Sequence, residues 1–270
     1  MDLFLSCDIE GCCGVTSWAD ADIRKGNTAA FAAAQLQMTR ETAAACAGAL
    51  DAGAARILVK DAHDTGRNLD LAALPEQVQV NRGWSGDLYG MMSGIQHGDW
   101  DAAAFVGYHS GASSAGSPLA HTLSTRVDYI EINGRRASEF TVSAYTAGLF
   151  GVPVCFVSGD AALCEQARRM IPRIACVPTC KGDGGSATCL HPAEAERRIH
   201  DALFTQLDSG VYRECLVTLP QEFEIFVRYL AEADAYRASF YPGAQLAEEK
   251  TIRFSCADFT EALRLFHFIL

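Results

Sequence analysis

The chain has 270 residues, 49% of them hydrophobic and 20% charged, and 33 acidic against 22 basic side chains give a net charge of −11. The length suits one large α/β domain with a small appendage, and the acidic surplus disfavours nucleic acid and anionic membrane as partners. The eleven cysteines are an odd number without repeated C-x-x-C pairs, which is more typical of reduced thiols than of a disulfide framework.

The start of the chain is predicted to be a first strand rather than a signal peptide. Residues 1–8 contain no basic stretch, and they reach the carboxylate of Asp8 before an apolar signal segment could form. Elsewhere, no apolar run approaches the roughly 20 residues that a membrane-spanning helix needs. We therefore expect a soluble, cytoplasmic protein.

Short apolar runs rich in β-formers alternate with helical stretches along most of the chain. The runs predict strands at 3–7, 56–60, 78–80, 102–106 and 153–157. The stretches between them predict helices at 28–52, 88–96, 138–149, 161–170 and 192–206, and Gly53 is a favourable cap for the first. This alternation favours an α/β fold with a mostly parallel sheet that helices cover on both faces.

Two segments depart from the alternation. A run at 128–132 is followed by Asn133-Gly134, a strong hairpin signal, which predicts an antiparallel ribbon there. After residue 206 the pattern predicts a strand at 222–227, a helix to about 237, a turn at 241–243, a strand at 250–254 and a final helix. We therefore expect a catalytic α/β domain over 1–206 and a smaller β-α-β-α unit over 207–270, with a mobile loop at 179–188.

Polar side chains directly follow three of the predicted strands. Asp8 and Glu10 follow the first, His63 follows the second and His109 follows the fourth. Ligands of doubly wound sheets bind beyond the carboxyl ends of the strands, so these side chains are expected at one edge. Asp8 and Glu10 point to the same side of an extended backbone, where a divalent cation would keep both ionised.

This residue set predicts a metal site. Mixed Asp, Glu and His ligands suit Zn, Mn, Fe or Ni better than Ca or Mg, and the donors suffice for two ions that share a carboxylate. Taken one at a time, Asp8 and Glu10 could be a solvated strand end, and His63 and His109 could be loop histidines. Three strands that all end in ligand residue types nevertheless favour the metal site, and two-metal sites usually catalyse hydrolysis.

Four stretches of the sequence share a pattern with one family. They are SCDIEGCCG at 6–14, DAH at 61–63, GYHSGAS at 107–113 and SE at 138–139. These stretches resemble the binuclear zinc D-aminopeptidases of the bacterial dipeptide-transport type. The resemblance extends over most of the chain and is weakest after about residue 206.

The resemblance implies a role for six residues. Asp8 would bridge two zinc ions, Glu10 and His63 would complete one site, and His109 and Glu139 would complete the other. His121 would be the catalytic histidine. Composition alone selects neither Glu139 nor His121. Glu139 could be an ordinary carboxylate at a helix N-terminus, and His121 could be an ordinary loop histidine.

The function that follows is a zinc-dependent aminopeptidase that hydrolyses short peptides with an N-terminal D-amino acid through a metal-activated water. The resemblance also implies two Zn²⁺ per subunit and a ring-stacked homo-oligomer, a decamer. Two alternatives stay open: a sibling metallo-amidase or peptidase for L-peptides or other small amides, and a non-catalytic metal-binding protein that forms rings. His121 could act as a base, an acid or an oxyanion stabiliser.

Five further residues near the candidate site have an open or secondary role. Asp61 and Asp64 are candidate acceptors for the N–H groups of the ligand imidazoles. Cys7, Cys12 and Cys13 surround the first ligand pair. They could compete for zinc as thiolates, or they could be small buried hydrophobic residues.

Overall fold

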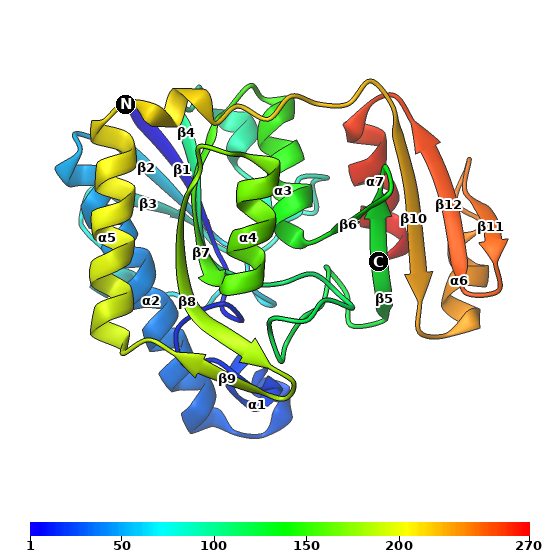
Figure 1. Ribbon diagram of the computed structural model, residues 1–270, viewed down its shortest axis with the longest axis horizontal. Helices are drawn as coiled ribbons and strands as arrows, with labels where there is room; N and C mark the ends of the chain where they lie inside the picture. Colours follow the sequence, from blue (N-terminus) through cyan, green and yellow to red (C-terminus); the bar gives the residue numbers. More distant parts are fainter.

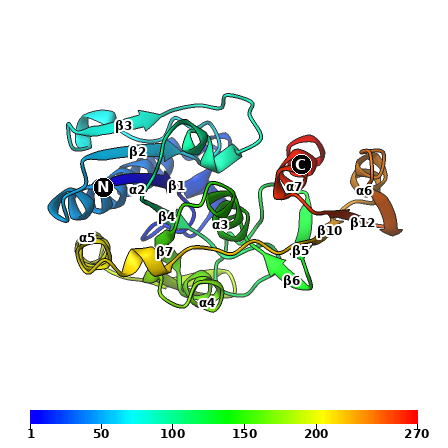
Figure 2. The same ribbon diagram turned by 90° about the horizontal axis from the view of Figure 1, so that it is seen from above.

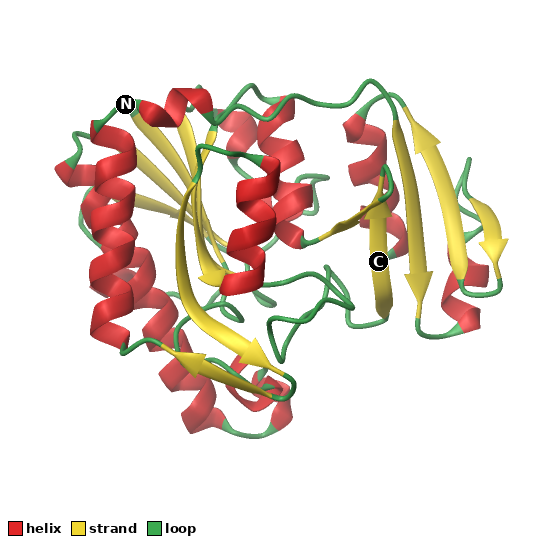
Figure 3. Ribbon diagram, viewed as in Figure 1, coloured by secondary structure: helices red, strands yellow, loops and turns green.

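The computed structural model covers residues 1–270 and contains two β-sheets with helices around them (Figure 1 and Figure 3). The strands are β1 (Asp2–Cys7), β2 (Arg56–Asp61), β3 (Val78–Asn81), β4 (Ala102–Tyr108), β5 (Val127–Ile132), β6 (Arg135–Ala137), β7 (Val154–Asp160), β8 (Ala175–Asp183), β9 (Ser186–Cys189), β10 (Phe223–Tyr229), β11 (Gln245–Glu248) and β12 (Thr251–Cys256). The α-helices are α1 (Trp18–Ala21), α2 (Thr28–Asp51), α3 (Glu139–Leu149), α4 (Ala161–Met170), α5 (Pro192–Asp208), α6 (Glu232–Ala238) and α7 (Phe259–Ile269).

The first sheet has seven strands in the order β3-β2-β1-β4-β7-β8-β9. All neighbours from β3 to β8 are parallel, and β9 pairs antiparallel with β8. Strand β1 is therefore an inner strand of the sheet, with β2 on one side and β4 on the other. The carboxyl ends of these three strands meet at one edge.

Helices cover both faces of this sheet. Alternate side chains of a strand point to opposite faces, so Leu5 and Phe4 of β1 belong to different cores. Leu5 shares its core with Phe31 of α2 and Leu203 of α5, and Phe4 shares the other core with Phe140 of α3. The predicted α/β fold with a mostly parallel sheet and helices on both faces is confirmed.

The second sheet is antiparallel, with the order β11-β12-β10-β5-β6. Its core joins Ile225 of β10 and Ile252 of β12 to Phe259 of α7 and Val142 of α3. Helix α3 thus contributes one side to the first sheet and another to the second, and it lies between the two sheets (Figure 2). The first residue of this shared helix, Glu139, is one of the candidate metal ligands.

The predicted hairpin at Asn133-Gly134 is present as β5 and β6. Both turn residues have positive φ, 51° and 74°, as the tight turn of such a hairpin requires. The hairpin belongs to the second sheet, next to β10 of the C-terminal segment. The second sheet therefore takes strands from both sides of residue 206, and the boundary of the proposed unit 207–270 stays a prediction.

Two local predictions are wrong. The segment 88–96 forms no α-helix but two 3₁₀ turns, Gly90–Met92 and Ile95–His97, because Gly90 and Gly94 adopt positive φ and interrupt the helical path. The glycine-rich segment 179–188 is not a mobile loop, because its ends pair as β8 and β9 around a turn at Gly184. Strand β11 was not predicted either.

No helix is both long enough and apolar enough to cross a membrane.

Candidate metal centre

Three neighbouring strands of the first sheet deliver the candidate ligands to one edge. Asp8 and Glu10 follow β1, His63 follows β2 and His109 follows β4. All four side chains are buried, with exposed fractions between 0% and 6%. The sequence-based expectation that they meet at the carboxyl ends of the strands is therefore confirmed.

Close backbone contacts fix the ends of β1 and β4 relative to each other. The N–H of Asp8 donates to Val106 O and that of Gly11 to Gly107 O, at 2.9 and 2.8 Å. A Cβ on Gly11 would come within 1.8 Å of Tyr108 O, and one on Gly107, whose φ is +71°, within 2.2 Å of Asp8 O. Because only glycine fits at both places, backbone packing sets the separation of the loops that carry Asp8 and His109.

The first ligand group consists of Asp8, Glu10 and His63, whose donor atoms all lie within 4.8 Å of one another. His63 Nδ1 is 3.3 Å from Asp8 Oδ1 and 3.1 Å from Glu10 Oε2. The other ring nitrogen, Nε2, contacts the carbonyl oxygen of Ala21 at 2.7 Å. Donation from Nε2–H to this carbonyl leaves the lone pair of Nδ1 aimed at the two carboxylates.

The second group consists of His109, His121 and Glu139. His109 Nε2 is 3.3 Å from Glu139 Oε2, and His121 Nε2 is 3.5 Å from Glu139 Oε1. The two imidazoles stack at 4.3 Å between centroids and 8° between planes. Glu139 is the first residue of α3, and its Oε1 also accepts a hydrogen bond from Leu123 N at 2.7 Å.

Asp8 lies between the two groups. Its Oδ1 faces His63 Nδ1 at 3.3 Å, whereas its Oδ2 faces His109 Nε2 at 3.5 Å. One carboxylate thus turns one oxygen to each group, which is the arrangement that a bridging ligand needs.

Backbone carbonyls orient the imidazoles of the second group as well. His109 Nδ1 contacts Ser110 O and His121 Nδ1 contacts Leu119 O, both at 2.9 Å. The prediction that Asp61 and Asp64 accept from the ligand imidazoles is therefore wrong. Asp61 instead accepts from the backbone N–H groups of residues 68 and 69, at 2.6 and 2.9 Å, and Asp64 accepts from an arginine.

Charge balance supports a cation at this place. Asp8 Oδ2, Glu10 Oε2 and His109 Nε2 are buried atoms that make no hydrogen bond. Burial and the neighbouring Glu10 raise the pKa of the Asp8 carboxyl well above its usual value. Burial disfavours a charged imidazole, yet Glu139 and Asp8 raise the pKa of His109 well above its usual value. A divalent ion would satisfy the unpaired atoms and neutralise the carboxylates, so these residues fit a metal.

The cysteines near the site are not ligands in this arrangement. The thiols of Cys7, Cys12 and Cys13 donate to the carbonyl oxygens of Lys60, Asp8 and Leu190, respectively, at 3.3, 3.3 and 2.9 Å. Burial raises the pKa of all three thiols, that of Cys13 to about 12. They are protonated, buried side chains, in agreement with the second interpretation of the sequence.

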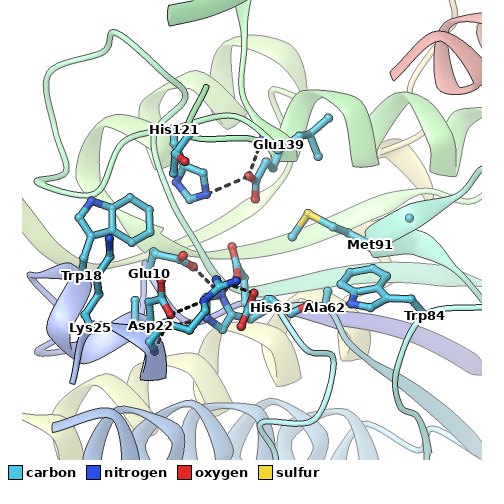
Figure 4. Close-up of a pocket in the computed structure, with 17 residues that line it drawn as sticks. Glu10, Trp18, Asp22, Lys25, Ala62, His63, Trp84, Met91, His121 and Glu139 are labelled. Carbon is cyan, nitrogen blue, oxygen red and sulfur yellow. Dashed lines mark hydrogen bonds and ion pairs between the residues drawn. The ribbon is translucent and has the colours of Figure 1, made fainter. Parts of the chain in front are cut away.

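Both ligand groups open into one cavity of about 540 Å³. Figure 4 shows His121 and Glu139 on one side of it and Glu10 and His63 on the other, with Trp18 and Trp84 at opposite ends. Trp18 contacts the His121 ring edge to face, with centroids 5.1 Å apart. Neither tryptophan could be placed at the cavity from its sequence context, because each reaches the cavity from a loop or short helix whose position depends on tertiary packing.

The fold and the donor set together define a class of enzyme. Two adjoining carboxylate–imidazole groups in a cavity at the carboxyl edge of a parallel sheet are typical of metal-dependent hydrolases. The particular family follows from the sequence, because the profile of the D-aminopeptidase family matches residues 1–268. The chain belongs to the D-aminopeptidase family.

A related sequence and a solved structure agree with this assignment. A D-aminopeptidase from Bacillus subtilis is 29% identical over an aligned length of 266 residues, and the alignment covers 97% of this chain and 94% of the relative. The structure of the zinc-dependent D-aminopeptidase DppA from Bacillus subtilis, described as a self-compartmentalizing protease, superimposes with a TM-score of 0.91. That superposition covers 100% of this chain and 96% of the other, at 26% sequence identity.

Proposed function

We propose that this protein is a zinc-dependent aminopeptidase that hydrolyses short peptides with an N-terminal D-amino acid. The observation that carries the proposal is the position of Asp8, with one oxygen toward each of two groups of buried carboxylates and imidazoles. Membership of the D-aminopeptidase family and the zinc dependence of the Bacillus subtilis enzyme DppA support the reaction and the metal.

Two zinc ions per subunit are proposed. Asp8 would bridge them, with Glu10 and His63 holding one ion and His109 and Glu139 holding the other. The donor set supports this assignment, because each imidazole directs one nitrogen into the site and anchors the other on a backbone carbonyl. His121 is proposed as the catalytic residue rather than a ligand, although its Nε2 lies 3.5 Å from Glu139 Oε1, only slightly farther than His109 Nε2 lies from Glu139 Oε2, at 3.3 Å.

The chemistry that bound zinc supplies is a water whose pKa falls from 15.7 to roughly 7, together with a Lewis acid for the scissile carbonyl. The proton of this water would be transferred by His121. His121 Nδ1 is held by Leu119 O, so its Nε2, which faces Glu139 Oε1 at 3.5 Å, carries the lone pair that can take a proton from the attacking water. Hydrolysis breaks the C–N bond, and the same nitrogen can return the proton to the leaving amine.

A stereochemical assay on the purified protein tests this proposal. We expect release of D-alanine from D-alanyl-D-alanine, slower release from the L,L isomer, and loss of both after metal removal by a chelator. Restoration by added zinc, with elemental analysis of the same samples, ties turnover to the metal. Equal or faster turnover of the L,L dipeptide would instead indicate the sibling peptidase for L-peptides.

The non-catalytic alternative gives a different outcome in the same assay. A metal-binding, ring-forming protein would hold zinc in the elemental analysis and hydrolyse neither isomer. It would also behave identically after His121→Ala, whereas a catalytic His121 predicts loss of turnover in that variant.

A homo-oligomer of stacked rings, of decamer size, is proposed for the assembly. The self-compartmentalizing character of the Bacillus subtilis enzyme supports it. Light scattering on the purified protein measures the mass directly, and a monomer of 29.0 kDa would exclude the assembly.

A cytoplasmic location is proposed because all eleven cysteines are free thiols, which is typical of a reducing compartment.

A further inference from the structure

The walls of the active-site cavity carry a second set of charges, separate from the two ligand groups. Besides Asp8, Glu10 and Glu139, the cavity is lined by Asp22 and Asp64, so five carboxylates surround it. The cationic side chains of the lining are two, Arg24 and Lys25, which are neighbours in the 3₁₀ turn Ile23–Lys25. These two residues differ in whether they are already paired.

Arg24 is committed to carboxylates of the protein. Its Nε donates to Asp22 Oδ1 at 2.8 Å, and one terminal nitrogen donates to Asp64 Oδ1 at 2.9 Å. Asp64, with a left-handed φ of 41°, also accepts the indole N–H of Trp84 on its carbonyl oxygen, at 2.6 Å. Arg24 therefore ties the turn that holds Lys25 to the loop after His63 and to Trp84 at the other end of the cavity.

Lys25 makes no ion pair and is exposed on the rim of the cavity. It lies on the same side as Trp18 and away from Trp84 and Met91 (Figure 4). Asp22 and Asp64 are paired with Arg24, so Lys25 is the cation of the lining that makes no ion pair and is left for the carboxylate of a ligand. Ammonium groups are strong donors to carboxylates, and Lys25 is free to donate.

We propose that Lys25 binds the C-terminal carboxylate of the substrate. Short peptides with a free carboxyl end are then preferred over the matching amides, because only the free acid offers Lys25 a carboxylate. Amidated peptides would leave Lys25 without its partner. This inference rests on the proposed aminopeptidase function and specifies its substrate class.

The test compares D-alanyl-D-alanine with D-alanyl-D-alaninamide, which have the same scissile bond and differ in the terminal charge. Lys25→Gln removes the cation and keeps a side chain of similar length. We expect the ratio of kcat/KM for the acid to kcat/KM for the amide to fall roughly 3- to 10-fold, through KM of the acid, because a partly exposed ion pair contributes modest binding energy. Lys25→Glu should lower the ratio further.

Lys181→Gln is the matched control, because Lys181 is an exposed lysine of β8 outside the cavity lining. It removes the same charge and should leave the ratio at the wild-type value. An unchanged ratio in Lys25→Gln, or an equal fall in Lys181→Gln, overturns the role of Lys25.

Calorimetric binding of the two dipeptides to the zinc-loaded protein separates this inference from the proposed function. If the wild-type protein binds the acid more tightly than the amide, and Lys25→Gln abolishes that difference, Lys25 recognises the carboxylate even if nothing is hydrolysed. Absence of turnover in the wild type would then contradict the aminopeptidase reaction alone. Equal binding of acid and amide by the wild type contradicts the inference.

Discussion

The two ligand groups occupy the same cavity but are built differently. Asp8, Glu10 and His63 follow two adjacent parallel strands, so the sheet itself brings them together. In the other group only His109 follows a strand of the parallel sheet, whereas His121 comes from the loop between β4 and β5 and Glu139 from the start of α3. The first group therefore depends on the register of β1 and β2, and the second depends on how α3 and the β4–β5 loop pack between the two sheets.

Removal of Asp8, the residue shared by both groups, should have the largest effect. We expect Asp8→Ala to lose both zinc ions and all measurable turnover, because neither group keeps a full donor set. Elemental analysis of Asp8→Ala and Glu10→Ala compares their zinc contents, since the loss of Glu10 should remove only the ion of the first group. Full zinc content in Asp8→Ala would contradict the bridging role.

Changing His121 tests whether the second group contains a residue that is not a ligand. His121→Ala should retain two zinc ions and lose roughly 10²- to 10⁴-fold in kcat, the usual contribution of a general acid or base. His97→Ala, at an exposed histidine of a 3₁₀ turn, is the control. Loss of one zinc equivalent in His121→Ala would make this histidine a ligand instead.

Each group also has its own buried carboxylate that holds the adjacent loop. Asp61 binds the backbone after His63, and Asp160 accepts from Ser110 N and Oγ, next to His109, at 2.6 and 2.5 Å. Asp61→Ala and Asp160→Ala should each lower the free energy of unfolding by about 2–3 kcal/mol, because buried donors lose their acceptor.

Zinc titration of the same two variants reveals whether the groups are independent. We expect Asp61→Ala to weaken the first site and Asp160→Ala the second, by roughly 10- to 100-fold, as is usual when the support of a ligand is removed. Equal weakening of both sites in either variant would show that the two groups behave as one unit.

An effect that depends on pH is expected at Glu41 of α2, which supports the loop after the first group and has no counterpart at the second. It is buried and accepts from Cys13 N at 2.7 Å, and burial raises the pKa of its carboxyl to about 7. Between about pH 4.3 and 7 the folded protein keeps a proton that the unfolded chain releases, so stability falls as pH rises through this window.

Glu41→Gln removes this titration and keeps an oxygen that can accept from Cys13. Its free energy of unfolding should exceed that of the wild type at pH 8 by up to about 3 kcal/mol and approach the wild-type value near pH 4. Urea unfolding at the two pH values measures the difference. A variant that gains the same stability at both would show that Glu41 does not titrate in this range.

The difference between ligands at strand ends and ligands from a loop or helix start explains which site residues could be predicted from the sequence. Asp8, Glu10, His63 and His109 follow apolar strand runs, and a parallel sheet brings strand ends together, so local pattern and topology were sufficient. Glu139 and His121 came only from a family resemblance, since their positions depend on packing over long sequence distances.

The fold shows the same limit in two other segments. The alternating strands and helices predicted the first sheet, but the glycine-rich composition of 179–188 concealed the β8–β9 pair. No local signal indicates that the β5–β6 hairpin joins the C-terminal strands, because that contact links residues about a hundred positions apart. The positions of Arg24, Lys25 and Trp84 at the cavity likewise depend on contacts between segments far apart in the sequence.

Gly11 and Gly107 are required by the fold rather than by the chemistry of the site. Gly11 and Gly107 are required because backbone atoms of the neighbouring strand occupy the space of a side chain, and this holds with or without metal ligands. A descendant of this fold that has abandoned hydrolysis can therefore replace Asp8 or His63 but must keep both glycines. In a newly sequenced relative, the glycines would mark shared ancestry, whereas the carboxylates and histidines beside them would indicate whether the chemistry has survived.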